Sequence, residues 1–303
     1  MEVDLRQGKL DLAGLEQRIR AEFPELRFAD AALNDFGEDH AVVVLDDRWG
    51  FRFPRGAAAA ACGAVERRLL ARLNAVSPVA TPRYEFVSEA GDFGGYRMIA
   101  GEELTEGAFA ALPRAAQESV LDEIGRFLGV LHALPASLVA RPGAETTRED
   151  AAWFAERYAE RRARLAEALG PALLTAADRF YQAFPAAVAT SDTAVIHRDF
   201  SEDHILLDLR SQRLAGVIDF TDAALGDPAF DFTFLWSYGR WAPARVLRSY
   251  DSVANPPGIL TRSLWWFVRF RIDQIWWSIS GARAYDVPRI VRELPTLFGE
   301  LGL

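Results

Sequence analysis

The stretch that decides the fold runs from Ile196 to Leu207 and reads Ile-His-Arg-Asp-Phe-Ser-Glu-Asp-His-Ile-Leu-Leu. It is followed by Gly-Val-Ile-Asp-Phe at residues 216–220. Two strands are predicted near 204–209 and 214–219, because a polar turn at 210–213 separates the two apolar runs. Pairing of these strands would bring Asp219 back beside His204. The spacing therefore predicts one site that contains Asp199, His204 and Asp219.

These residue types suit the transfer of a phosphoryl group. That reaction needs a carboxylate that orients the attacking hydroxyl and accepts its proton, magnesium held between the phosphates, and a cation that contacts the phosphates. Asp199 can supply the carboxylate, and His204 and Asp219 are both able to bind a metal. We therefore expect phosphoryl-transfer chemistry with Mg²⁺ as the cofactor.

The chain around this stretch divides into a strand-rich part and a helix-rich part. In the first part, helices are predicted at 12–23 and 57–74, and strands at 41–45, 49–53, 83–88 and 95–100. After residue 101, helices are predicted at 115–134, 149–169, 171–189 and over most of 228–300. This change of character predicts two domains, 1–100 and 101–303.

Composition restricts the possible partners. The 303 residues carry a net charge of -9, which argues against a broad nucleic-acid surface. The single cysteine, Cys62, excludes an internal disulfide. No apolar run approaches the roughly 18 residues of a membrane span, and residues 1–10 lack the apolar core of a signal peptide. We expect a cytoplasmic monomer or homodimer with no nucleic-acid or membrane partner.

The order of motifs matches the catalytic loop of protein kinases, His-Arg-Asp followed after four residues by Asn, and then Asp-Phe-Gly. This sequence departs from that pattern twice, because His204 occupies the Asn position and Thr221 the Gly position. The segment between Asp219 and Asp227 is too short for the activation loop of a protein kinase. The motifs therefore favour a small molecule as the phosphoryl acceptor.

The chain resembles the aminoglycoside phosphotransferase family, which shares the kinase-like fold. Residues 197–206 are similar to the 2''-aminoglycoside phosphotransferases, in which His stands at the position of His204. The resemblance implies an α+β fold with two lobes, a small N-terminal lobe with an antiparallel sheet and a larger helical C-terminal lobe. It also implies that Asp199 is the catalytic residue, that His204 and Asp219 bind magnesium, and that ATP or GTP is the donor.

The same resemblance indicates which residues would bind the nucleotide. Arg52 stands where the family usually has a phosphate-binding Lys, and Glu66 where a helical glutamate pairs with that cation. Arginine suits phosphate because its planar group presents several donors. Met98, Ile99 and Ala100 would form the hinge that contacts the nucleotide base.

The acceptor is the least defined part of the prediction. An aminoglycoside antibiotic is the first expectation, with weak or narrow activity, and a macrolide or another hydroxylated natural product is the alternative. Ammonium groups need carboxylates around them, whereas residues 232–241 offer aromatic side chains and Arg240. Tryptophans gather between 236 and 277, where they could form core or an aromatic wall for the acceptor. The candidate acceptor residues are Glu202, Asp203, Asp222, Asp231, Trp236 and Asp273.

Two other classes of function remain open from the sequence. A metal-dependent phosphohydrolase could use His197, Asp199, His204 and Asp219 as ligands. An inactive nucleotide-binding scaffold would account for the unusual Arg52 and His204. Nucleotide-dependent turnover distinguishes both from an antibiotic-resistance kinase.

Overall fold

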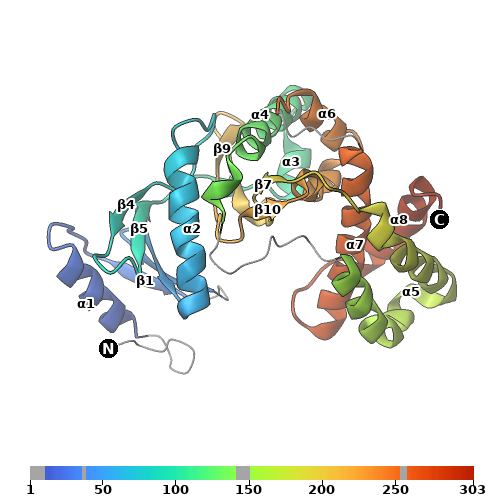
Figure 1. Cartoon of the computed structure of the whole chain (residues 1–303), viewed down its shortest axis with the longest axis horizontal. Coiled ribbons are helices and arrows are strands. Elements are labelled where there is room, and N and C mark those ends of the chain that lie inside the picture. The colour runs from blue at the N-terminus through green and yellow to red at the C-terminus, as the bar shows by residue number, and fades with distance from the viewer. Residues whose placement is uncertain (1–10, 36–38, 141–150, 253–257) are drawn as a thin grey trace.

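The computed structural model of the chain describes residues 11–35, 39–140, 151–252 and 258–303. Its first part contains a five-stranded antiparallel sheet in the order β1-β2-β3-β5-β4. The strands are β1 (Ala31–Asn34), β2 (His40–Leu45), β3 (Trp49–Pro54), β4 (Tyr84–Val87) and β5 (Gly94–Arg97). Helices α1 (Leu12–Glu22) and α2 (Ala57–Leu73) pack with this sheet (Figure 1).

The turn between β2 and β3 fixes how β3 enters the sheet. Asp46 and Asp47 both have positive φ, 49° and 52°, which suits the right-handed twist of a tight hairpin. The Asp46 carboxylate also accepts hydrogen bonds from the backbone N–H groups of Ala29 and Asp30, at 2.9 and 2.8 Å. The predicted hairpin at 46–48 is confirmed, and its register places Arg52 opposite Val42.

The second part of the chain contains most of the helices. They are α3 (Glu106–Ala111), α4 (Arg114–His132), α5 (Ala151–Ala187), α6 (Ala242–Arg248), α7 (Ile259–Ser280) and α8 (Val287–Glu300). Helix α5 is interrupted at Gly170, which has φ 69° and precedes Pro171. The sequence predicted separate helices on either side of this point, at 149–169 and 171–189, although residues 149 and 150 lie outside the described residues.

Two small sheets lie among these helices and carry the predicted motifs. Strand β7 (Ala194–Ile196) pairs with β10 (Ala224–Gly226). Strand β8 (Ile205–Asp208) pairs with β6 (Glu102–Glu103) and with β9 (Arg213–Val217). The β8–β9 pair is the hairpin predicted from the sequence, whereas β1, β6, β7 and β10 were not predicted.

Within the described residues, three apolar clusters form the core. The first joins α1 to the five-stranded sheet, the second joins α2, α4 and the small sheets, and the third joins α5, α7 and α8. Trp265 and Trp266 lie in the third cluster and are 8% and 2% exposed. For these two side chains, the interpretation of the tryptophan-rich region as core is confirmed.

The arrangement agrees with the predicted α+β architecture, a small antiparallel sheet followed by a larger helical part (Figure 1). The predicted boundary at residue 100 stays a prediction. Ala80 of the first part bridges to Gly216 of the second, and the backbone N–H of Val217 donates to the carbonyl of Ala80. In the described segments, no helix has both the length and the apolar character needed to cross a membrane.

Candidate active site

The loop after β7 holds Asp199 in a fixed position. Asp231 is fully buried, and its carboxylate accepts hydrogen bonds from the backbone N–H groups of His197 (2.7 Å) and Arg198 (2.9 Å). The same carboxylate lies 3.0 Å from Nε2 of His132. Arg198 has a φ of 72°, a conformation that needs such support in a residue other than glycine. Asp231 therefore stabilises the turn that presents Asp199.

His204 lies beside Asp199, at the end of the short 3₁₀ helix Glu202–His204. Its Nδ1 is 2.8 Å from the carbonyl oxygen of Asp199 and 3.4 Å from the Asp199 carboxylate. Because a carbonyl can only accept, Nδ1 carries the proton in this contact. The lone pair of Nε2 is then available on the side where Asp219 lies, 3.9 Å away.

Asp219 follows β9, and two side chains donate hydrogen bonds to it. Its Oδ1 accepts from the Thr221 hydroxyl at 2.8 Å and from Arg52 at 3.0 Å. Burial alone would raise the pKa of Asp219, but the charge of Arg52, with these hydrogen bonds, holds it well below its ordinary value. Asp219 is therefore ionised, as a metal ligand must be.

Asp219 and His204 form a pair that fits magnesium. Among the described residues, no group of three or more His, Cys, Asp or Glu side chains is arranged to hold a metal by itself. Magnesium is usually bound by one or two carboxylates together with substrate phosphates and water, and Asp219 supplies such a carboxylate. The pair therefore fits an ion that arrives with a nucleotide.

Arg52 connects the first part of the chain to this site. It forms an ion pair with Glu66 (3.1 Å) and donates to the Thr221 hydroxyl at 2.7 Å. Glu66 is fully buried and accepts two more hydrogen bonds, from the Tyr84 hydroxyl at 2.9 Å and the Phe220 backbone at 3.3 Å. Burial raises the pKa of Glu66, and the charge of Arg52 partly offsets this rise. The structure thus pairs the two residues as expected, and their role toward phosphates stays a prediction.

Met98, Ile99 and Ala100 form the connection that runs from β5 toward β6. Met98 is 45% exposed, and its backbone N–H donates to the carbonyl of Arg48 at 2.8 Å. Ile99 packs close to Gly216 in β9. A Cβ atom added to Gly216 would lie 3.0 Å from the side chain of Ile99. Contact of these three residues with a nucleotide base stays a prediction.

The candidate acceptor residues do not form one group. Glu202 accepts from the backbone N–H of Glu106, Asp203 pairs with Arg283 at 2.8 Å, and the Trp236 indole donates to Ser263 at 3.0 Å. Asp222 is exposed, and its pKa is raised by partial desolvation and then by the charge of Asp199. The effect of the Asp199 charge on the pKa of Asp222 indicates that these two carboxylates lie within electrostatic reach of each other.

Two of the acceptor predictions need correction. Asp231 is buried, and its carboxylate accepts hydrogen bonds from the backbone of the loop that contains Asp199 and lies within hydrogen-bond distance of His132. It is therefore not available to an acceptor. Asp273 is 7% exposed, and its two oxygens pair with Arg161 (3.1 Å) and Arg269 (2.6 Å). Both carboxylates are therefore occupied by groups within the protein.

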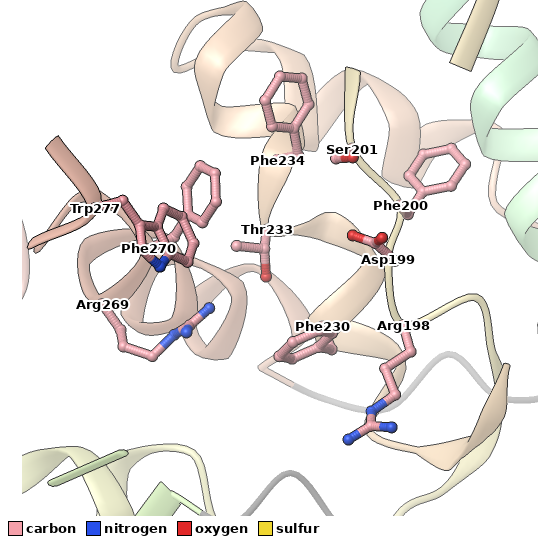
Figure 2. A pocket seen from close by; sticks show the side chains of 10 residues that line it. All are labelled: Arg198, Asp199, Phe200, Ser201, Phe230, Thr233, Phe234, Arg269, Phe270 and Trp277. Atoms are coloured by element: carbon pink, nitrogen blue, oxygen red, sulfur yellow. The ribbon is translucent and has the colours of Figure 1, made fainter. Parts of the chain in front are cut away.

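A cavity beside Asp199 contains residues that the sequence did not single out. Its volume is about 150 Å³, and Figure 2 shows its lining side chains from the catalytic loop, from residues 230–234 and from α7. Those outside the catalytic loop are Phe230, Thr233, Phe234, Arg269, Phe270 and Trp277. Trp277 belongs to the tryptophan-rich region for which the sequence offered an aromatic wall as one alternative, whereas the phenylalanines were not singled out.

Comparison with known proteins identifies relatives of this chain. A curated relative, the uncharacterized protein YcbJ of Bacillus subtilis (strain 168), is 36% identical over 64 residues, which are 21% of each protein's length. The solved GDP and kanamycin complex of APH(2")-IIia has a TM-score of 0.73 and 22% identity, with 95% of this chain and 97% of that one covered. The macrolide 2'-phosphotransferase MphH from Brachybacterium faecium gives 0.62 and 22%, with 94% and 97% covered. At these identities the two solved structures show that the fold is shared.

The family assignment rests on a longer match. The model of the phosphotransferase enzyme family matches residues 30–261, which include β3, α2, the catalytic loop and the β8–β9 hairpin. The predicted resemblance and the kinase-like, two-lobed α+β fold are therefore confirmed. This chain belongs to the phosphotransferase enzyme family.

Proposed function

We propose that this protein is a small-molecule kinase that transfers the γ-phosphoryl group of ATP or GTP to a hydroxyl group. The observation that carries the proposal is the convergence of Asp199, His204 and Asp219 at one site, with the Arg52–Glu66 pair directly behind it. Asp199 is half exposed, so an acceptor can reach it. The cytoplasm, which holds both nucleotides and magnesium, is the predicted place of action.

The residues divide the reaction among them. The Asp199 carboxylate orients the acceptor hydroxyl and takes its proton as the oxygen attacks the γ-phosphorus, while the bond from the γ-phosphorus to the β-phosphate oxygen breaks and the nucleoside diphosphate leaves. His204 and Asp219 would hold magnesium, which neutralises charge on the phosphates when it is bound. Arg52 lies 3.0 Å from Asp219 and would exchange part of that contact for phosphate oxygens.

The geometry also weakens the phosphohydrolase alternative. That reading needs His197 as a metal ligand, but His197 is fully buried and its Nε2 lies 2.9 Å from the carbonyl of Ile218. Burial lowers the pKa of His197, so its ring stays neutral and supports the loop. The inactive-scaffold alternative is less favoured because both Asp199 and Asp219 are present, 3.4 and 3.9 Å from the His204 ring nitrogens.

Antibiotics remain the first acceptors to test. Kanamycin is bound in one structural neighbour, and another neighbour is a macrolide phosphotransferase. The experiment measures phosphate transfer from ATP and from GTP to both drug classes, with magnesium, at low and high salt. Aminoglycoside binding should weaken as salt rises, because screening acts on charge pairs.

The outcomes separate the proposed functions. Transfer to any hydroxyl acceptor that needs both nucleotide and magnesium supports the kinase. Phosphate release from phosphate esters with zinc or manganese alone, without nucleotide, would replace it by a phosphohydrolase. Binding of nucleotide with no turnover on any hydroxyl compound would favour the inactive scaffold.

A further inference from the structure

The cavity next to Asp199 is large enough for one ring. Its volume is about 150 Å³, similar to that of an engineered protein cavity that binds benzene. Phe230, Phe234, Phe270 and Trp277 supply apolar and aromatic walls. Such walls favour the flat or apolar face of a compound over a densely hydrated one.

Two residues that line this cavity each have a buried polar atom with no hydrogen-bond partner in the described part of the chain. These atoms are the Thr233 hydroxyl oxygen and Nε of Arg269, and the two residues are 8% and 7% exposed. Buried polar groups in proteins nearly always have a hydrogen-bond partner. Figure 2 shows Thr233 between Asp199 and Arg269, and the side chains of Thr233 and Arg269 both belong to the wall of the cavity. Because arginine can only donate, the missing partner of Arg269 is an acceptor.

The charges around these atoms favour an anion. Arg269 and Arg161 share a single carboxylate, that of Asp273, so this group of three side chains carries one excess positive charge. Arg198 also lines the cavity. The one carboxylate in the lining is Asp199, which the proposed reaction reserves for the acceptor hydroxyl. An ammonium group in the cavity would therefore face cations, whereas a carboxylate would find donors.

We propose that the acceptor is a ring-sized hydroxylated compound bearing a carboxylate, which Arg269 and Thr233 bind while Asp199 receives the hydroxyl. This inference rests on the proposed kinase function, which supplies the role of Asp199. It differs from the polycationic acceptor that the sequence favoured. The apolar ring occupies the aromatic part of the cavity, and the carboxylate supplies the acceptor that both polar atoms lack.

Three matched probes test the charge preference by equilibrium binding. They are 4-(hydroxymethyl)benzoate, 1,4-benzenedimethanol and 4-(aminomethyl)benzyl alcohol, which share the ring and the hydroxymethyl group and differ in charge. Binding is measured by calorimetry on the full chain with magnesium and a non-hydrolysable ATP analogue. The carboxylate should bind about tenfold or more tightly than the neutral diol, as expected for a hydrogen bond to a charged group. Equal binding of all three, tighter binding of the amine, or binding of none overturns the proposal.

Variants locate the preference in the cavity. Thr233→Val keeps the shape of the side chain and should weaken carboxylate binding about tenfold, with little effect on the diol. Thr175→Val is the matched control, because Thr175 lies in α5 outside the cavity and bonds the Pro171 carbonyl. Arg269→Gln should remove most of the difference between carboxylate and diol. An unchanged preference in Thr233→Val overturns the assignment even if Arg269→Gln fails to fold.

Phosphate transfer to the same probes is measured separately with ATP. A carboxylate preference in binding supports the acceptor class whether or not transfer occurs. If no phosphate is transferred to any hydroxyl compound, including the antibiotics of the panel, the result would instead count against the kinase function. The two proposals can therefore fail independently.

Discussion

Arg52 and Asp219 form an ion pair of 3.0 Å that joins strand β3 to the loop after β9. The same guanidinium pairs with Glu66 of α2, so one side chain holds two carboxylates from separate parts of the chain. Burial would lower the pKa of Arg52, but these two carboxylates raise it well above its ordinary value. The cation that the proposed reaction needs at the phosphates is therefore positioned before any nucleotide binds.

The first prediction concerns this buried pair. Arg52→Met should lower the free energy of unfolding by about 3 kcal/mol, because Glu66 would remain as a buried charge without its partner. Arg52→Met combined with Glu66→Met should recover part of that loss, since both charges are removed together. Denaturant unfolding of the three proteins measures the difference. A double variant less stable than Arg52→Met would show that the pair is not the source of the effect.

The second prediction concerns Asp199. Asp199→Asn should fold normally and bind nucleotide, because the side chain is half exposed. Its turnover should fall by about a hundredfold or more, since the amide cannot accept the hydroxyl proton. Steady-state kinetics with an active acceptor measures the loss, and a nucleotide titration is the control. Near-normal turnover in the folded variant would remove Asp199 from the catalytic role.

The third prediction separates the two metal-binding candidates. Asp219→Ala should abolish magnesium-dependent turnover, because it removes the carboxylate and a partner of Arg52. His204→Asn should retain a measurable part of the activity, since Asn is the residue that protein kinases have in this loop. Magnesium titrations of both variants at saturating nucleotide make the comparison. If His204→Asn were as inactive as Asp219→Ala, the site would depend on an imidazole.

The motifs of the catalytic loop could be predicted because local spacing determines their geometry. Asp199 and His204 lie in one loop, and hairpin pairing alone returns Asp219 to it. The Arg52–Glu66 pair was predicted from a resemblance, and residue spacing gave no indication of its other partners. In the structure, Glu66 also accepts a hydrogen bond from the backbone N–H of Phe220, the residue directly after Asp219.

The acceptor side could not be predicted from the sequence in the same way. The cavity depends on how α7 packs against residues 230–234, and no periodicity in either segment specifies that contact. Asp231 and Asp273 are acidic residues in plausible places, but their roles follow from neighbours distant in sequence, His132 and Arg161. A carboxylate in the sequence does not indicate which donors of the folded chain will bind it.

The last prediction concerns the dependence of stability on pH. His40, at the start of β2, is 5% exposed. Burial, followed by the positive charge of Arg52, lowers its pKa from 6.5 to about 4. The unfolded chain therefore binds a proton between these values that the folded protein does not bind. The contribution of neutral His40 to the free energy of unfolding is therefore fully present above pH 6.5 and is lost as the pH falls toward 4.

The change attributable to His40 across this range is about 3 kcal/mol, from the size of the shift. His40→Gln, which cannot be protonated, should flatten the curve of unfolding free energy against pH between 6.5 and 4. Because burial also lowers the pKa of His197, the parent protein is the reference and the difference between the two curves is the measurement. Two parallel curves across this range would show that His40 is not protonated on unfolding, and would place the pH dependence elsewhere.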